Sequence, residues 1–231
     1  MTVLWLSPIA GILSYVLTRL LIGYAITHRV VDIPNDRSSH NRSVPRGGGL
    51  AIALSFQACL FVCWATELIA TNFMIALSGS GGLVALIGFI DDHRSVPVGW
   101  RLTVHFLAAA VALFSLGGVP ELRIFGVIFS AGWQSSVLGA IAIVWFLNLY
   151  NFMDGTDLLA GIEAGTVCIA GALLCLWTSP GAPTWMVPML LAASVAGFLC
   201  WNLPPAKVFM GDVGSGFLGV TLAIIALQAG W

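Results

Sequence analysis

Long hydrophobic runs separated by short polar stretches make up most of the chain, and this pattern predicts α-helices that cross a membrane. A transmembrane helix needs about 20 mainly apolar residues. Stretches of about that length occur at residues 3–24, 48–66, 72–90, 101–118, 132–150, 159–178, 184–201 and 214–230. We therefore expect an all-α fold, a polytopic membrane helical bundle with about eight transmembrane helices, which forms a single integral membrane domain over residues 1–231.

One connection between these runs has a different pattern. Residues 117–132 contain the stretch Glu121-Leu-Arg-Ile-Phe-Gly-Val-Ile-Phe129, in which β-branched and aromatic residues flank a glycine. This composition is typical of two short strands joined by a turn. We expect a short hairpin here, on the outer surface.

The composition supports the membrane assignment and excludes several other classes. The chain is 59% hydrophobic and only 8% charged, whereas about 25% of the residues in ordinary soluble domains are charged. The net charge is -1 and no nucleic-acid-binding motif is present, so we expect no nucleic-acid partner. All five cysteines lie inside apolar runs and none forms a C-x-x-C pair, which favours packing over a disulfide or zinc site.

The basic residues are distributed unevenly between the two sides of the predicted bundle. Because consecutive spans alternate in direction, the loops near 25–47, 91–100, 151–158 and 202–213 fall on one side. Every Lys and Arg except Arg123 lies in or near these loops, so the positive-inside rule places this side in the cytoplasm. The first run has no basic residue before it and no small-residue cleavage signal after it, which predicts a retained helix rather than a signal peptide.

Acidic residues gather on the same side, although the positive-inside rule does not require it. Only Glu67 and Glu121 lie on the other side, and Glu163 lies just inside a helix. The acids of the cytoplasmic loops are Asp32, Asp36, Asp91, Asp92, Asp154, Asp157 and Asp212. Acids beside membrane-length runs indicate a functional site, so we expect these loops to form one.

Asp91 and Asp92 follow the apolar run that ends at Ile90. At the C-terminal end of a helix, the helix dipole adds a partial negative charge to the two carboxylates. Such a group needs a cation, which could be a metal ion, Arg94 or Arg101, or else one Asp could stay protonated with a raised pKa. The alternative is an ordinary pair of exposed loop acids.

A second polar stretch, Asn148-Leu-Tyr-Asn-Phe-Met-Asp-Gly-Thr-Asp157, lies between two apolar runs. Asn151, Asp154 and Asp157 are three residues apart, so on a helical turn their side chains would form one row. Such a row can chelate a metal, or bind a base or sugar by hydrogen bonds. The alternative is a polar turn that caps the next helix, because Asp, Asn and Gly favour turns.

Asp212 lies just before the last apolar run, within Gly211-Asp-Val-Gly-Ser-Gly216. In isolation it would be interpreted as an ordinary helix N-cap. Its carboxylate neighbours on the same side make a site for a hard metal the better interpretation. Carboxylate and phosphate oxygens suit Mg²⁺, which usually takes one or two protein carboxylates and substrate phosphates.

The first cytoplasmic loop, residues 31–49, supplies the basic counterpart. Its side chains Arg37, His40, Arg42 and Arg46 are charge-assisted donors, and Gly47-Gly-Gly49 can present backbone N–H groups to an anion. Basic donors that face clustered acids at a membrane surface indicate a site for a phosphorylated substrate and its Mg²⁺.

Four stretches of the chain resemble one family, the polyprenyl-phosphate N-acetylhexosamine-1-phosphate transferases of bacterial glycosyl transferase family 4. They are Asp-Ile-Pro-Asn-Asp-Arg-Ser-Ser-His (32–40) with Pro-Arg-Gly-Gly-Gly (45–49), Gly-Phe-Ile-Asp-Asp (88–92), Asn-Phe-Met-Asp-Gly-Thr-Asp (151–157) and Pro-Ala-Lys-Val-Phe-Met-Gly-Asp-Val-Gly-Ser (205–215). The family includes bacterial enzymes that start O-antigen (lipopolysaccharide), enterobacterial common antigen and peptidoglycan lipid intermediates. The first stretch is most similar to the O-antigen-initiating branch.

The resemblance implies a reaction in which a polyprenyl (undecaprenyl) phosphate attacks a UDP-N-acetylhexosamine and releases UMP. It implies catalytic roles for Asp91 and Asp92, and Mg²⁺, or Mn²⁺ instead, on Asp212 and Asp92. Phe209 would stack near the uracil. The implied substrate-binding residues are Arg37, His40, Arg46, Asn148, Asn151, Asp154, Asp157, Lys207 and Phe209.

The resemblance also implies a setting and a set of partners. We expect a multi-pass protein of the bacterial inner (plasma) membrane with its active site in the cytoplasm, and a homodimer is an open alternative. Departures from the family pattern are also present, among them an unusual Asn41-Arg-Ser-Val44 before Pro45. Leu158 stands where the family usually has glycine, and the family normally continues through further helices beyond the position of Trp231, so we expect the C-terminal helices to be absent.

Two functions from other classes compete with the transferase. A cation- or proton-coupled transporter would place its acids near the middle of the spans, whereas these acids cluster at the ends. An inactive membrane scaffold is the other alternative.

Overall fold

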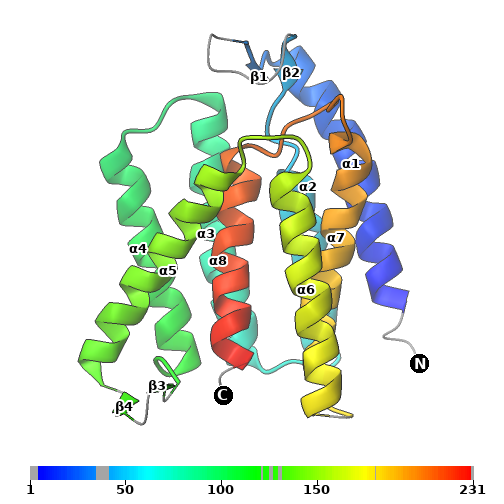
Figure 1. Ribbon diagram of the computed structural model, residues 1–231. Helices are drawn as coiled ribbons and strands as arrows, with labels where there is room; N and C mark the ends of the chain where they lie inside the picture. Colours follow the sequence, from blue (N-terminus) through cyan, green and yellow to red (C-terminus); the bar gives the residue numbers. More distant parts are fainter. Residues whose placement is uncertain are drawn as a thin grey trace.

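The computed structural model describes residues 5–34, 42–120, 122–124, 127–129, 132–179 and 181–229. These residues form an all-α bundle, which confirms the predicted fold class (Figure 1). A short 3-10 helix, η2 (Pro183–Trp185), precedes α7. The α-helices are α1 (Leu6–Thr27), α2 (Leu50–Ala65), α3 (Thr71–His93), α4 (Val98–Leu116), α5 (Trp133–Met153), α6 (Leu159–Thr178), α7 (Met186–Asn202) and α8 (Gly211–Ala229).

Each predicted hydrophobic run corresponds to one helix, but one run gives a shorter helix than predicted. Seven helical segments of the described chain are long and apolar enough to cross a membrane. The exception is α2, whose 16 residues span about 24 Å. Gly48 and Gly49 were predicted as helical, yet their N–H groups donate to the carbonyls of Phe209 and Met210. The chain therefore enters the α2 helix later than its hydrophobicity suggests.

The connections alternate between the two ends of the bundle, as the sequence predicts. Figure 1 shows the α1–α2, α3–α4, α5–α6 and α7–α8 connections together at one end, here called the site end. The first of these contains β1 (Val31–Asp32) and β2 (Val44–Pro45), which pair antiparallel. At the opposite end, β3 (Leu122–Ile124) pairs antiparallel with β4 (Val127–Phe129), which confirms the predicted hairpin.

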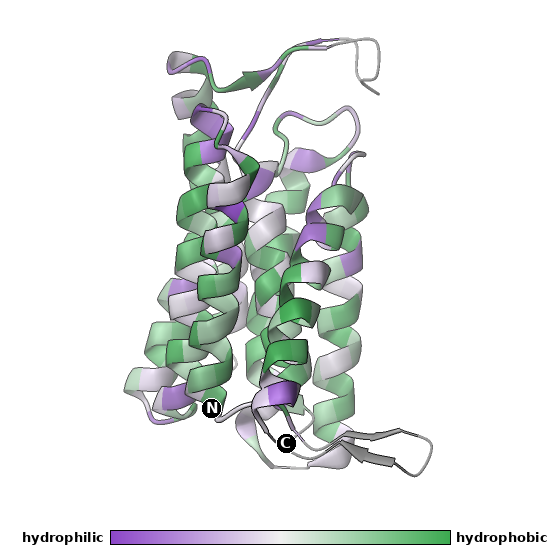
Figure 2. Cartoon of the chain, turned by 90° about the vertical axis from the view of Figure 1, so that its left-hand side faces the viewer, coloured by the Kyte–Doolittle hydropathy of each residue, from purple (hydrophilic) through white to green (hydrophobic). Residues whose placement is uncertain are grey.

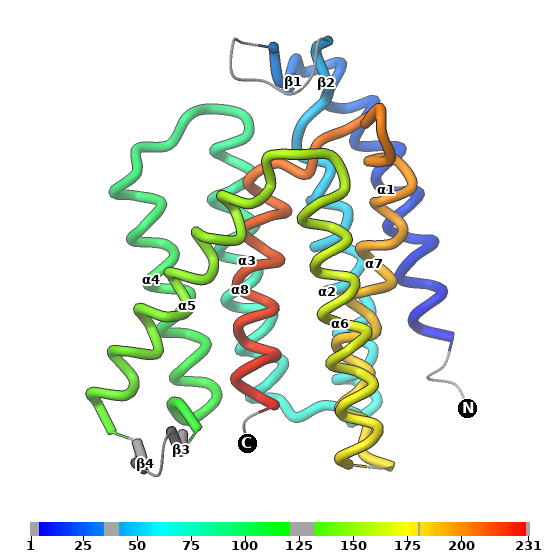
Figure 3. The backbone as a smooth tube through the Cα atoms, viewed as in Figure 1, coloured from blue at the N-terminus to red at the C-terminus, as the bar shows by residue number. Residues whose placement is uncertain are grey.

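The last helix, α8, occupies the centre of the bundle (Figure 3). It contacts α2, α3, α4, α5 and α6, and most of its residues are buried. Small residues permit this crowding, since a Cβ atom on Gly219 would lie 2.9 Å from the Cα atom of Leu147 on α5. Close approach through glycine is a common way to pack membrane helices.

The outer surface of the bundle is strongly apolar. Phe114, Phe152 and Trp177 are each more than four-fifths exposed. Figure 2 shows mostly hydrophobic helix shafts, with hydrophilic residues gathered toward the site end. Soluble proteins rarely expose so large an apolar area, so the distribution supports a multi-pass membrane protein.

Candidate active site at the contact of α3 and α8

Asp91 lies in the last turn of α3 and is held by the segment that follows. Its Oδ1 atom accepts a hydrogen bond from the backbone N–H of Val96 at 2.6 Å. Its Oδ2 atom pairs with Arg101 Nη1, on the first turn of α4, at 2.8 Å. Of the cations that the sequence left open for this acid pair, the structure therefore places Arg101 beside Asp91.

Asp92, the next residue, is turned into the protein, and its side chain is 0% exposed. Its Oδ1 and Oδ2 atoms accept hydrogen bonds from the backbone N–H groups of Asp212 (2.9 Å) and Val213 (3.1 Å). Arg46 Nε also lies 2.7 Å from Oδ1. A carboxylate at a helix N-terminus satisfies N–H groups that have no partner within the helix and complements the helix dipole. Asp92 thus caps α8 from another helix.

Two glycines let this carboxylate reach the start of α8. A Cβ atom on Gly88, one turn before Asp92, would lie 2.6 Å from the carbonyl of Asp212. Gly211 has a φ of +76°, and a Cβ atom on it would lie 2.5 Å from Asp92 Oδ2. Side chains at either position would push α3 and α8 apart.

Arg46 connects two of the acids. Besides its contact with Asp92, its Nη2 atom lies 3.1 Å from Asp212 Oδ2. Burial alone would lower the pKa of Arg46, but the neighbouring carboxylates, Asp92 first and Asp212 second, outweigh that effect and raise it. Arg46 therefore stays charged in this half-buried position.

The backbone of Phe209 fixes the segment that carries Arg46. The N–H of Phe209 donates to the carbonyl of Pro45 at 2.8 Å, and its carbonyl accepts from the N–H of Gly48 at 3.0 Å. This pairing joins the α1–α2 and α7–α8 connections on both sides of Arg46. The structure thus gives Phe209 a positional role through its backbone, while the stacking of its ring on uracil stays a prediction.

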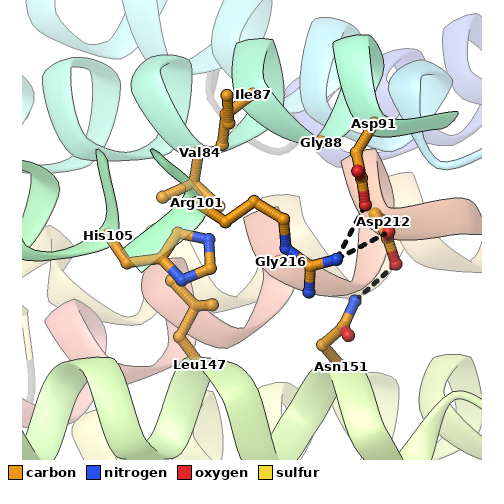
Figure 4. A pocket seen from close by; sticks show the side chains of 10 residues that line it. All are labelled: Val84, Ile87, Gly88, Asp91, Arg101, His105, Leu147, Asn151, Asp212 and Gly216. Atoms are coloured by element: carbon orange, nitrogen blue, oxygen red, sulfur yellow. Dashed lines mark hydrogen bonds and ion pairs between the residues drawn. The ribbon is translucent and has the colours of Figure 1, made fainter. Parts of the chain in front are cut away.

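Asp212 is the point where the elements converge (Figure 4). Its Oδ1 atom accepts a hydrogen bond from Asn151 Nδ2 at 2.8 Å, and the same nitrogen lies 2.8 Å from Ser215 Oγ. Arg101 Nη1 lies 3.8 Å from Oδ2, so this guanidinium group lies between Asp212 and its other partner, Asp91. With its side chain 21% exposed, Asp212 is the most accessible of the three paired carboxylates.

His105 is a neighbour of this cluster that the sequence did not single out. It is buried on α4, and it lines a cavity of about 10 Å³ together with Asp91, Arg101, Asn151 and Asp212. That volume corresponds to about one water molecule. No motif marks His105, since a single histidine in a hydrophobic run usually reflects packing. Only its position four residues after Arg101 could have suggested it.

Asn148 lies one turn below Asn151 and does not reach the acids. Its Nδ2 atom donates to the carbonyl of Val144 at 2.7 Å and lies 3.4 Å from His105 Nδ1. Its role in substrate binding stays a prediction from the family resemblance.

The predicted row of Asn151, Asp154 and Asp157 is wrong. Helix α5 ends at Met153, so only Asn151 lies on it. Asp157 instead lies in the turn before α6, where its Oδ2 atom accepts from the N–H of Ala206 at 3.1 Å. The helix stops because the following residues, Asp154-Gly155-Thr156, favour a turn. Asp157 lies in a turn, as the alternative predicted, but it does not cap α6, whose N-terminus has no side-chain cap hydrogen bond.

Asp154 follows α5 directly, and its side chain lies near the cluster without a hydrogen-bond or ion-pair partner among the described residues. Burial, and then the charges of Asp212 and Asp92, raise its pKa from the usual value to about 7, while Arg46 opposes the shift. Its charge near neutral pH therefore depends on what binds beside it.

The remaining predicted residues are placed elsewhere or fall outside the described structure. Lys207 Nζ lies 5.1 Å above the ring of Trp201 and makes no ion pair with an acid of the described chain. Arg42, on the same loop as Arg46, donates weakly to the carbonyl of Pro205 at 3.4 Å. Arg37 and His40 lie outside the described residues.

The charges of the cluster leave room for a cation. Among the described residues, Asp91, Asp92 and Asp212 contact two guanidinium groups, those of Arg46 and Arg101. Within the described ranges, no group of three or more His, Cys, Asp or Glu side chains is arranged to hold a metal. Mg²⁺ usually takes only one or two protein carboxylates and completes its shell with phosphates and water. Asp91 and Asp212, which both lie near Arg101 Nη1, fit that requirement.

Comparison with known proteins gives a consistent assignment. Residues 73–230 match the profile of "Glycosyl transferase family 4". A "Probable undecaprenyl-phosphate N-acetylglucosaminyl 1-phosphate transferase" of Bacillus subtilis (strain 168) is 30% identical, over 92% of this chain and 59% of the relative. An "Undecaprenyl-phosphate alpha-N-acetylglucosaminyl 1-phosphate transferase" of Thermotoga maritima is 30% identical, over 92% of this chain and 62% of the relative.

A third relative carries a different name. A "Phospho-N-acetylmuramoyl-pentapeptide-transferase" of Mycobacterium sp. (strain KMS) is 31% identical, over 94% of this chain and 72% of the relative. The chain thus spans about three-fifths of the length of the first two relatives.

Proposed function

The chain belongs to glycosyl transferase family 4, and from that membership and the site geometry we propose that it transfers an N-acetylhexosamine-1-phosphate from a UDP-sugar to a polyprenyl phosphate. An oxygen of the lipid phosphate would attack the β-phosphorus of the donor. The bond from that phosphorus to the oxygen of the α-phosphate would break, and UMP would leave. The names of two relatives, which specify N-acetylglucosaminyl transfer, favour that sugar.

One observation carries the proposal, the convergence of Asp91, Asp212, Arg46 and Arg101 at the end of two membrane helices. Phosphoryl transfer depends mainly on positioning and on neutralising charge. Both guanidinium groups already bridge carboxylates, and each is about one-third exposed. A phosphate that enters the site can therefore exchange places with a carboxylate on the same arginine, at a small cost in desolvation.

The acids then have different tasks. Asp92 uses both oxygens to hold α8 and Arg46, so it positions the site. Asp212 and Asp91 would hold Mg²⁺, which would neutralise the diphosphate and the departing UMP. Asp91 would also orient the lipid phosphate, together with Arg101, which it contacts. At neutral pH both phosphates are already ionised, so the lipid oxygen needs orientation more than deprotonation.

The predicted nucleotide-binding residues surround this centre. Asn151 donates a hydrogen bond to the Asp212 carboxylate, and Asp154 lies close enough for the charge of Asp212 to raise its pKa. We assign Arg37, His40, Arg46, Asn148, Asn151, Asp154, Asp157, Lys207 and Phe209 to substrate binding, as the family resemblance implies. The site end would face the cytoplasm of a bacterial cell, where UDP-sugars are available, and the product would start a cell-envelope glycan such as O-antigen.

The polyprenyl chain needs an apolar path to this centre. A cavity of about 300 Å³ lies between α2, α3 and α8, and its lining runs from Gln57 to Leu50 and Phe89 at the site end. Leu50 begins the helix that follows Arg46, so the cavity and the charged cluster are neighbours. This arrangement is compatible with a lipid acceptor.

The test is UMP release by the purified protein with undecaprenyl phosphate, Mg²⁺ and a panel of UDP-N-acetylhexosamines. We expect UMP with at least one sugar, dependent on both the lipid and the metal, and its loss when EDTA is added. UMP no higher than in the lipid-free control, with every sugar tested, would contradict the proposal and leave the scaffold alternative.

A further inference from the structure

A second charged group lies at the site end, on the opposite side from α3, where α1 and α7 touch. These helices run in the same direction and meet through glycine, because a Cβ atom on Gly197 would overlap the carbonyl of Gly11. One turn further along both helices, Trp201 packs on Tyr15 with ring centres 5.0 Å apart. The indole Nε1 donates to the carbonyl of Tyr15 at 3.1 Å. The indole is therefore fixed between the helices.

Two cations approach this indole. Arg19 Cζ lies 5.9 Å from its ring centre and Lys207 Nζ lies 5.1 Å from it. Both side chains are exposed. Neither has a carboxylate within 4.0 Å among the described residues, in contrast to Arg46 and Arg101. The group, called here the indole cluster (Arg19, Trp201 and Lys207), thus carries two uncompensated positive charges.

The position of the indole cluster along the membrane-spanning helices indicates which anion could pair with its two positive charges. Trp201 is the penultimate residue of α7, and Arg19 lies about two turns before the end of α1, so both lie in the half of the bundle that is nearer the site end. Tryptophan concentrates at the membrane boundary, and long basic side chains extend toward it. Basic pockets between helices at this level bind anionic head groups. Below Arg19, exposed Ile12 and Val16 offer an apolar path along α1.

We propose that the indole cluster binds the phosphodiester head group of an anionic phospholipid such as phosphatidylglycerol, with an acyl chain along α1. Arg19 and Lys207 donate to the phosphate oxygens, and the indole holds the two cations together through its ring face. The lipid site shares Lys207 with the residues assigned to substrate binding, but it uses no residue of the acid cluster (Asp91, Asp92 and Asp212 with Arg46 and Arg101). Lipid retention is measured without a nucleotide, so it can fail or succeed separately from the transferase proposal.

The test compares lipid retention by native mass spectrometry of the purified chain, with equal amounts of phosphatidylglycerol and phosphatidylcholine in the detergent. We expect the unmodified protein to retain phosphatidylglycerol preferentially. The double variant Arg19→Gln with Lys207→Gln should lose about tenfold or more of this retention, because each basic residue near a membrane contributes substantially. The matched control, Arg29→Gln with Arg94→Gln, removes two exposed charges at the same end and should keep it.

A charge-conserving variant, Arg19→Lys with Lys207→Arg, separates a loss of charge from a loss of fold, and it should keep the preference for phosphatidylglycerol. Equal retention of the two lipids by the unmodified protein would overturn the proposal. So would undiminished phosphatidylglycerol on the Arg19→Gln with Lys207→Gln protein.

Discussion

Two charged groups at the same end of the bundle are built in the same way and differ in charge balance. In both, glycine lets two helices approach closely, Gly88 for α3 and α8, and Gly197 for α7 and α1. In the acid cluster, every carboxylate of Asp91, Asp92 and Asp212 contacts a guanidinium group. In the indole cluster, two cations share one aromatic ring, and neither contacts an acid of the described residues.

The difference in charge balance suits the two clusters to different tasks, the acid cluster to positioning a substrate and the indole cluster to binding a lipid. Charges that are paired within the protein keep one geometry before substrate arrives, which is what phosphoryl transfer requires. Charges that are left unpaired at a membrane boundary are available to a ligand from the membrane. The three carboxylates of the acid cluster also outnumber its two guanidinium groups. A divalent cation can therefore bind there while the carboxylate–arginine ion pairs stay in place.

The largest expected effect comes from neutralising Asp212, whose carboxylate lies near both Arg46 and Arg101. Asp212→Asn should reduce UMP release by about 10³-fold, because Arg46, Arg101 and the metal lose their shared anionic partner. Its melting temperature in detergent should change little, since the side chain is partly exposed. The control Glu67→Gln neutralises an acid at the opposite end and should keep its activity. A rate for Asp212→Asn within a few-fold of the unmodified protein would remove Asp212 from the active site.

A second substitution distinguishes two acids within the same cluster. Asp92→Asn should lower the free energy of unfolding by about 3 kcal/mol, because a buried charge pair and the cap of α8 are broken. Activity should fall along with the melting temperature, as measured side by side in detergent. An unchanged melting temperature combined with lost activity would instead indicate that Asp92 acts directly on the substrate or metal.

The pH dependence of stability should report on Asp154, which borders the acid cluster and whose side chain has no hydrogen-bond or ion-pair partner in the described parts of the chain. Because the pKa of about 7 in the folded protein exceeds the unfolded value, the folded state binds more protons between about pH 4 and 7. Stability should therefore fall as the pH rises through that window and level off above it. Asp154→Asn stays neutral and should remove this contribution, which leaves it more stable than the unmodified protein above pH 7.

Melting temperatures of the two proteins from pH 4 to 9 check this, since all other titrating groups are shared. A constant difference between the two curves across the range would show that Asp154 is not perturbed.

The smallest expected effect lies outside both clusters, at Leu158. This residue has a φ of +70°, which costs a non-glycine residue about 1 kcal/mol, and its N–H donates to Asn202 Oδ1 at 2.8 Å. Leu158→Gly should therefore raise the melting temperature slightly, while Leu159→Gly, at an ordinary helical position, should lower it. Lower stability of Leu158→Gly would mean that the packing of the leucine outweighs the strain.

The lengths of the hydrophobic runs were sufficient to predict the helices and their order. The alternation of the loops between the two sides then predicted that the acids gather at one end. The structure also explains why the family usually has glycine at the position of Leu158. The backbone there is left-handed, directly before α6, and glycine adopts that conformation without strain. Local pattern could not reveal that Asp92 caps α8, because the capped N–H groups belong to Asp212 and Val213, far along the chain. The position of Lys207 on Trp201 likewise depends on a contact between helices.

The central claim, transfer of a sugar phosphate rather than of a sugar alone, is tested most directly with a UDP-N-acetylglucosamine labelled at its β-phosphorus. After incubation with undecaprenyl phosphate and Mg²⁺, the lipid and nucleotide fractions are separated and counted. The account predicts that the label moves into the lipid and that the released nucleotide is unlabelled UMP. Label that stays in the nucleotide, as UDP, while the sugar appears in the lipid would contradict it.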